Sequence, residues 1–209
     1  MDGAAKKDAL LQALLPEVPF DGWSATSMRA AAGRAGLAAG ELDALFPKGP
    51  RDAVAWFSRW ADRETLAALK AARRRGLRTH ERVALGVKTR LGILLPHREA
   101  VRRALSLLAL PQNMPLGAML LYEAVDTIWH GAGDASTDFN FYTKRGLLAG
   151  VYAATMLYWL DDRSEDAAAS EAFLARRLAD VLAIPRLKDT AARLAAPLRI
   201  LRALRPRST

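Results

Sequence analysis

Apolar residues recur every three to four positions along almost the whole chain, and a sustained alternation of apolar and polar residues occurs nowhere in it. The first pattern is typical of helices with one buried face, whereas the second would indicate strands. Proline and glycine mark the ends of the apolar segments. The pattern predicts helices over residues 5–15, 24–34, 39–46, 51–75, 79–95, 96–110, 115–130, 138–160 and 165–183, followed by a basic tail helix. The fold is therefore expected to be all-α.

The lengths of these helices divide the chain into three parts. Short helices form a head over residues 1–50, longer helices form a body over residues 51–184, and residues 185–209 form a tail. The chain has 209 residues, of which 51% are hydrophobic and 25% charged. Such a composition is typical of a globular protein with a sizeable core.

Net charge and residue usage limit the partners and sites that the chain can have. The net charge is +9, which favours nucleic acid or an anionic membrane face as a partner without choosing between them. The absence of cysteine excludes disulfides and thiolate metal sites. The longest apolar segment, residues 146–160, is shorter than the roughly 20 residues that span a bilayer and is flanked by charges, so we expect a buried helix there.

The head has the layout of a helix-turn-helix. Met28, Ala31 and Ala32 give an inner face, and Gly36 is placed to make the tight turn. This layout resembles the head of TetR-type regulators. The second helix carries Glu41 and Asp43, which repel phosphate, and it has no arginine, asparagine or glutamine to contact a base edge. We therefore expect no DNA binding, and a ligand-responsive TetR-type regulator remains the alternative function.

The most specific motif lies at Asp126–Asp162. It contains Gly-Asp-Ala-Ser-Thr-Asp-Phe-Asn at 133–140, followed by Phe-Tyr-Thr-Lys-Arg at 141–145. The segment resembles the signature of the lipid-binding accessory family of ubiquinone biosynthesis, and the helix layout agrees over nearly the whole chain. Phe141 stands where the family pattern has tryptophan, which keeps an apolar contact but loses the indole donor.

The resemblance implies a fold and a role. It implies a TetR-like protein without DNA binding and without catalytic activity, which holds an isoprenoid quinone precursor or a phospholipid in its body. It also implies presentation of that precursor to the demethoxyubiquinone hydroxylase, a homodimer, and a peripheral place on the inner face of a bacterial membrane or the matrix face of the mitochondrial one.

The body carries more large apolar residues than one buried face requires, which indicates an apolar cavity between helices. Plain core packing explains the same pattern. With the resemblance, the expected lipid-binding residues come from three helices: Leu91, Leu95, Met119, Tyr122, Val125, Trp129, Leu148, Val151 and Tyr152.

The resemblance also places a partner-binding surface at the start of the signature helix. The residues expected to contact the hydroxylase are Asp138, Phe139, Asn140, Phe141, Tyr142, Lys144 and Arg145. Exposed aromatic residues such as Phe141 often anchor interfaces.

In the tail, apolar residues and arginines fall on opposite sides of a helix. This pattern is typical of a helix in a membrane interface, although the tail could also pack against the body. The expected membrane-binding residues are Leu194, Leu198, Arg199, Ile200, Leu201, Arg202, Leu204 and Arg205.

Glu123, Asp126 and His130 fall on successive turns of one helix and suggest half of a carboxylate-rich metal site. Such sites need a matching Glu-x-x-His on a second helix, which the sequence lacks. We therefore expect no metal, no other cofactor and no catalytic residue, and a bound lipid as the ligand.

Overall fold

The computed structural model describes residues 2–38, 40–72, 76–133 and 140–183, and the regular structure in these ranges is entirely helical. The α-helices are α1 (Gly3–Leu14), α2 (Val18–Asp21), α3 (Ala25–Arg34), α4 (Glu41–Leu45), α5 (Pro50–Ala71), α6 (Thr79–Leu94), α7 (Arg98–Leu108), α8 (Met114–Gly131), α9 (Asn140–Asp161) and a last helix over residues 168–183. Short 3-10 turns at Leu95–His97, Pro111–Asn113 and Glu165–Ala167 precede α7, α8 and the last helix. The expectation of an all-α fold is confirmed.

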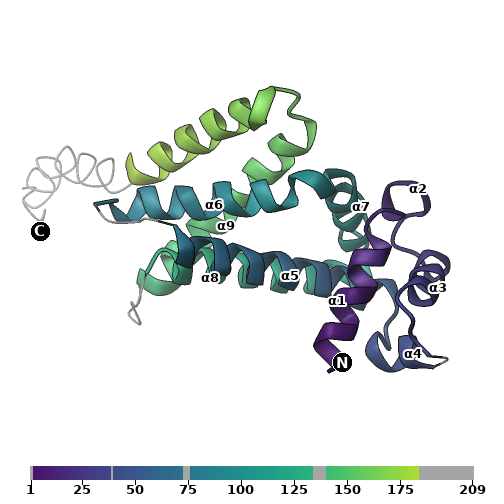
Figure 1. Ribbon diagram of the computed structural model, residues 1–209. Helices are drawn as coiled ribbons and strands as arrows, with labels where there is room; N and C mark the ends of the chain where they lie inside the picture. The colour runs from purple at the N-terminus through teal and green to yellow at the C-terminus, as the bar shows by residue number, and fades with distance from the viewer. Residues whose placement is uncertain (1, 39, 73–75, 134–139, 184–209) are drawn as a thin grey trace, which may run out of the picture.

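The long helices α5, α6, α8 and α9 lie alongside one another, and α1 to α4 gather at one end of them (Figure 1). The core is continuous across this arrangement, because buried side chains from Leu10 in α1 to Leu174 in the last helix form one cluster. The head and the body therefore share one core, while the division at residue 50 stays a prediction.

Local chemistry explains the ends of the head helices. Ser24 begins α3 through a capping box, in which its hydroxyl accepts from the backbone N–H of Ser27 and Ser27 accepts in return from the N–H of Ser24. Gly36 ends the turn with φ of +68°, a left-handed conformation that glycine adopts without strain. The expected role of Gly36 is confirmed.

Two short features differ from the sequence prediction. The sequence predicts no helix over residues 16–23, but α2 forms at Val18–Asp21, because Pro19 occupies its first turn, where no backbone N–H is needed. The predicted single helix over 165–183 is interrupted at its start, since Asp166 and Ala167 have positive φ angles of 50° and 58°.

Two glycines let the body helices approach closely. A Cβ on Gly86 of α6 would lie 2.8 Å from Cγ2 of Ile128, and one on Gly131 of α8 would lie 2.5 Å from Cδ1 of Leu69 in α5. A side chain at either position would force its neighbour to shift, which is easier for the flexible end of Leu69 than for Ile128. The close contact of α6 with α8 therefore depends on Gly86.

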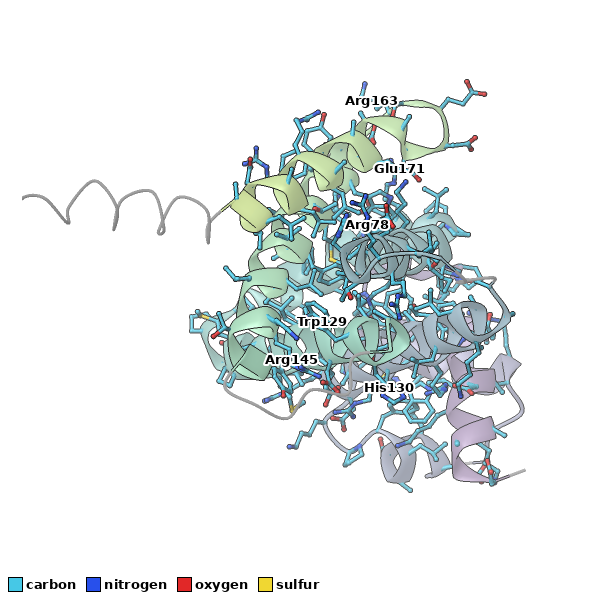
Figure 2. The ribbon with its side chains drawn as sticks, turned by 90° about the vertical axis from the view of Figure 1, so that its left-hand side faces the viewer. Arg78, Trp129, His130, Arg145, Arg163 and Glu171 are labelled. Carbon is cyan, nitrogen blue, oxygen red and sulfur yellow. The ribbon has the colours of Figure 1, made fainter. Side chains whose placement is uncertain are left out.

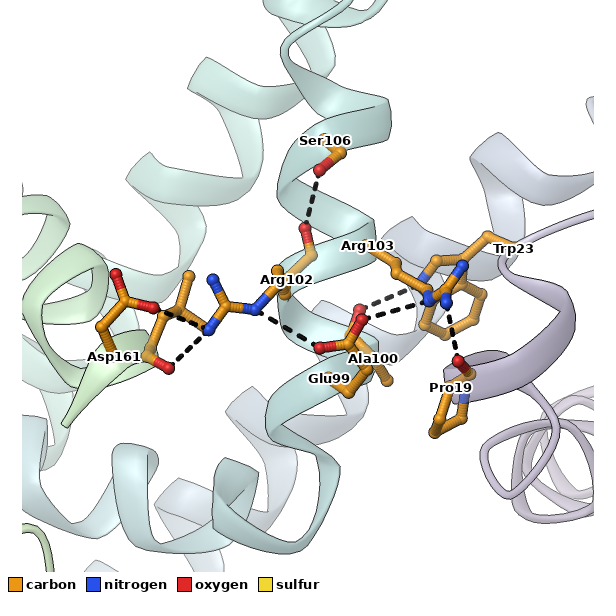
Figure 3. Close-up of polar contacts among 9 residues, drawn as sticks. Pro19, Trp23, Glu99, Ala100, Arg102, Arg103, Ser106 and Asp161 are labelled. Carbon is orange, nitrogen blue, oxygen red and sulfur yellow. Dashed lines mark hydrogen bonds and ion pairs between the residues drawn. The ribbon is translucent and has the colours of Figure 1, made fainter. Parts of the chain in front are cut away.

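Helix α7 ties the head to the end of α9 (Figure 3). Arg103 donates to the carbonyl of Pro19 over 2.7 Å, and the indole of Trp23 donates to the carbonyl of Ala100 over 3.0 Å. On its other side, Arg102 donates to Asp161 Oδ1 over 2.9 Å. These bonds fix α7 between the two regions.

In the described ranges, no single helix is long and apolar enough to cross a membrane. A pair of segments, Thr79–Leu108 and Pro111–Gly131, meets the length and composition together but is bent by 100°.

Candidate lipid site

An apolar cavity of about 290 Å³ lies between α6, α8, α9 and the last helix. We call it the outer cavity. Its lining residues are Thr79, His80, Val83, Trp129, Lys144, Leu147, Leu148, Val151, Leu178, Val181 and Leu182. Three of the residues expected to bind lipid, Trp129, Leu148 and Val151, meet here. The walls are almost entirely hydrocarbon, which suits an apolar chain.

Trp129, one of the lining residues, carries a buried polar group. The residue is only 9% exposed, and its Nε1–H finds no acceptor among the described residues. The Nζ atom of Lys144 lies 5.7 Å from the ring centroid, within the range of a cation–π contact. Trp129 and Arg145 lie where α8 and α9 pack together (Figure 2). A buried donor without an acceptor is costly, so an occupant with an oxygen acceptor would be favoured here.

A second cavity of about 100 Å³ borders a neighbouring face of α9, and we call it the inner cavity. Its walls come from α5 to α9, and they comprise Val54, Phe57, Ser58, Arg90, Leu94, Val101, Ala104, Leu105, Leu108, Gly117, Leu120, Leu121, Ala124, Tyr152 and Met156. Tyr152 is the one expected lipid-binding residue on it. Because successive residues of a helix point about 100° apart, Val151 and Tyr152 contribute to different cavities.

A buried polar cluster forms part of the inner wall. The Arg90 guanidinium pairs with Asp62 through Nη1, donates from Nε to Tyr152 Oη over 2.7 Å and donates from Nη2 to Ser58 Oγ over 3.2 Å. Burial raises the pKa of Asp62 to about 6, against the opposing effect of the Arg90 charge. Burial likewise raises the pKa of the Tyr152 hydroxyl, so it stays protonated at neutral pH.

The nine residues expected to bind lipid do not line one cavity. Leu91 and Leu95 border a third hollow beside Trp159. Val125 is fully buried in the packed core. The remaining two, Met119 and Tyr122, are exposed on α8. The expectation of a single cavity is therefore wrong for this structure, because apolar residues encircle α8 and the sequence does not show which of them face inward.

The expected partner surface is only partly described. Asp138 and Phe139 lie outside the described residues, as do the side chains of Asn140, Phe141 and Tyr142 in the first turn of α9.

Two residues of that surface are placed. Lys144 is half-buried beside Trp129. Arg145 is only 5% exposed, and its Nε donates to Asp126 Oδ1 over 2.8 Å. The Arg145 guanidinium thus holds α9 against α8, and a contact of this residue with the hydroxylase stays a prediction.

The expected membrane-binding residues, from Leu194 to Arg205, lie outside the described residues. Their role stays a prediction.

The second helix of the helix-turn-helix layout is α4, on which the expectation of no DNA binding rests. α4 has five residues, and it carries the acidic side chains of Glu41 and Asp43. Glu41 is paired with Lys6 of α1 at 2.5 Å, and hydrogen bonds from Lys6 and from the Ala38 backbone lower its pKa. Lys6 thus neutralises one of the two acidic side chains, and the absence of DNA binding stays a prediction.

The carboxylates considered as half of a metal site have other partners. Arg59 forms a two-pronged bond to Glu123, with N···O distances of 3.0 and 3.1 Å. Asp126 accepts from Arg145. In the part of the chain that the structure describes, no group of three or more His, Cys, Asp or Glu side chains could hold a metal ion.

Sequence reasoning missed the polar cluster, although a signal for it was present. Val83, Val87 and Leu94 mark the buried face of α6, and Arg90 falls on the same face. Asp62 likewise interrupts the buried face of α5. A charged residue at a buried position of the helical repeat indicates a paired buried charge.

Comparison with known proteins agrees with the resemblance found in the sequence. Residues 114–185 match the family model COQ9. The chain is 36% identical over 181 residues to the mitochondrial ubiquinone biosynthesis protein COQ9 of Rattus norvegicus and 35% identical over 182 residues to that of Homo sapiens. Each alignment covers 83% of this chain, and the chain spans 57% and 56% of the two relatives.

The fold has a close match among solved structures. The TetR transcriptional regulator from Nitrosomonas europaea superposes with a TM-score of 0.68 at 20% identity, over 83% of this chain and 95% of that one. The expectation of a TetR-like fold is confirmed.

Proposed function

From its relationship to the COQ9 proteins, we propose that this chain serves ubiquinone biosynthesis as a non-catalytic protein that binds an isoprenoid lipid. Both relatives are named as ubiquinone biosynthesis proteins. Since the chain spans little more than half of each relative's length, its own activity and partners are part of the proposal.

The observation that carries the lipid-binding proposal is the outer cavity. Its walls are hydrocarbon over nearly their whole area, and Trp129 supplies one buried donor without an acceptor. An isoprenoid chain attached to an oxygen-bearing ring would meet both features. The chain would displace water from the apolar walls, and an oxygen of the ring would accept from Nε1.

Substrate presentation is the finer part of the proposal. We expect the lipid to be handed to the hydroxylase that acts on demethoxyubiquinone, through the surface that begins at Asp138. Loss of hydroxylase capture by Phe141→Ala protein in a pull-down assay would support this surface, and unchanged capture would contradict it.

Membrane attachment is a further part of the proposal. The arginines at 199, 202 and 205 would meet anionic headgroups, each contributing about 1 kcal/mol near the surface. Changing all three to glutamate should abolish sedimentation with anionic vesicles, and unchanged sedimentation would contradict the role of the tail. Assembly as a homodimer, expected from the TetR-like fold, is checked by light scattering.

The lipid-binding proposal is tested at the mouth of the outer cavity. Leu147 lines the cavity and is 38% exposed, so Leu147→Trp should fill the cavity without disrupting the core. Leu157 lies on the same helix, is 61% exposed and lines none of the cavities, so Leu157→Trp is the matched control.

Lipid that co-purifies with each protein is measured by mass spectrometry. We expect Leu147→Trp protein to lose most of it and Leu157→Trp protein to keep the wild-type amount. Equal lipid in both folded variants would overturn the placement of the lipid in the outer cavity.

A further inference from the structure

The hydroxyl of Tyr152 donates no hydrogen bond to any described residue. Its side chain is 2% exposed, and its oxygen accepts from Arg90 Nε. Among the described residues this is the one hydrogen bond that Tyr152 makes, so its own proton has no acceptor. The residue forms part of the inner cavity wall. A buried donor of this kind is stabilised when an acceptor enters the cavity.

The charge of the cluster restricts what could enter. Arg90 and Asp62 neutralise each other, and both are buried. An anionic ligand would be opposed by Asp62 and a cationic ligand by Arg90, and either would lose its hydration on entering. The cluster therefore favours a neutral molecule that only accepts a hydrogen bond.

The remaining walls restrict its size and polarity. Apart from Ser58, Arg90 and Tyr152, the lining residues are apolar or glycine. The volume of about 100 Å³ is similar in scale to the roughly 150 Å³ of an engineered apolar cavity that binds benzene. The space accordingly suits one small ring or a short chain.

We propose that the inner cavity is a separate binding site for a small neutral molecule with an apolar body and one carbonyl oxygen. The oxygen accepts the proton of Tyr152, whose position is fixed by Arg90. The body packs against Leu94, Val101 and Leu105. This site shares no lining residue with the outer cavity.

The test measures how two probes of the same shape bind to the full chain after bound lipid has been removed. Cyclohexanone carries the carbonyl acceptor, and methylenecyclohexane replaces that oxygen with a CH₂ group. Binding is followed by NMR titration of the methyl groups of Leu94, Val101 and Leu105. Tyr152→Phe should lower the affinity for cyclohexanone about fivefold, the effect of one hydrogen bond, and leave the affinity for methylenecyclohexane unchanged.

Two further variants keep the outcome clear. Leu105→Phe should fill the inner cavity and abolish binding of both probes, which also tests the site if Tyr152→Phe protein does not fold. Leu147→Trp, at the outer cavity, should leave both affinities unchanged. The proposal is overturned if neither probe binds, if Tyr152→Phe weakens both probes equally, or if the shifts map to Leu178 and Leu182.

Discussion

The two cavities beside α9 differ although neighbouring residues of one helix line them. Val151 contributes to the outer cavity and Tyr152 to the inner one. The inner cavity is built around a paired and hydrogen-bonded cluster, whereas the outer cavity is apolar with a single unpaired indole donor. One helix can therefore support a small site with a fixed polar anchor and a larger site that selects mainly by hydrophobic contact.

The largest effect should follow from breaking the inner cluster. Arg90→Met removes the cation that pairs with the buried Asp62 and the donor to Tyr152 and Ser58, which should lower the free energy of unfolding at pH 7 by about 3–5 kcal/mol. Urea denaturation measures the change. The matched control, Glu81→Gln, removes an exposed partner of Arg78 and should change stability little. Equal stability of the two variants would show that the cluster is not structurally important.

The pH dependence of stability should report the same cluster. The pKa of Asp62 is about 6 in the folded protein and 3.8 in the reference state, so the unfolded chain ionises first as pH rises. The contribution of Asp62 to the free energy of unfolding is complete below about pH 4 and is lost as the pH rises through 6. Two pKa units correspond to about 3 kcal/mol.

That dependence is isolated by subtracting a variant that lacks the titrating group. The stability of the wild type relative to Asp62→Asn should fall by about 3 kcal/mol between pH 4 and pH 7, because the other groups cancel. A difference that rises over this range would mean that Arg90 holds the pKa of Asp62 below its reference value.

Removing the hydroxyl of Tyr152, which lines the inner cavity, should have a smaller effect on stability. Tyr152→Phe keeps the ring but leaves Arg90 Nε without its acceptor, which should cost about 1–3 kcal/mol. Thermal and urea unfolding of ligand-free protein measure this cost. No loss of stability would indicate that Arg90 finds another partner.

The outer cavity should give the smallest effect. Trp129→Phe removes packing surface, but it also removes a buried N–H that has no acceptor among the described residues, and the two changes offset each other. We expect lipid-free protein to change by less than about 1 kcal/mol. A loss of about 3 kcal/mol or more, the usual cost of truncating a large core side chain, would show that Trp129 is simply part of the core.

The sequence predicted the helices well because proline and glycine mark their ends. The prediction of residues 79–95 differs from α6 by one residue, and that of residues 115–130 differs from α8 by one at each end. The motif at Asp126–Asp162 led to the family resemblance, which the comparisons confirm. The four-residue α2 was missed, since Pro19 at its start looks like a helix breaker.

The cavities could not be predicted to the same degree. Periodicity shows that α8 is apolar on nearly every side, but the inward side depends on which helices pack against it. Met119 was therefore grouped with Leu148, although Met119 is exposed and Leu148 lines the outer cavity. The cluster of Arg90 and Asp62 joins residues 28 positions apart, a pairing that the spacing along one helix does not reveal.

The shared wall of the two cavities has a thermodynamic consequence. A molecule that shifts α9 from the inner side changes the shape that the outer side offers to lipid. By linkage, any such coupling is equal in both directions, so the factor by which a small molecule alters lipid affinity is the factor by which lipid alters affinity for the small molecule. Measuring either one determines the other, and a factor of one would establish α9 as a rigid partition.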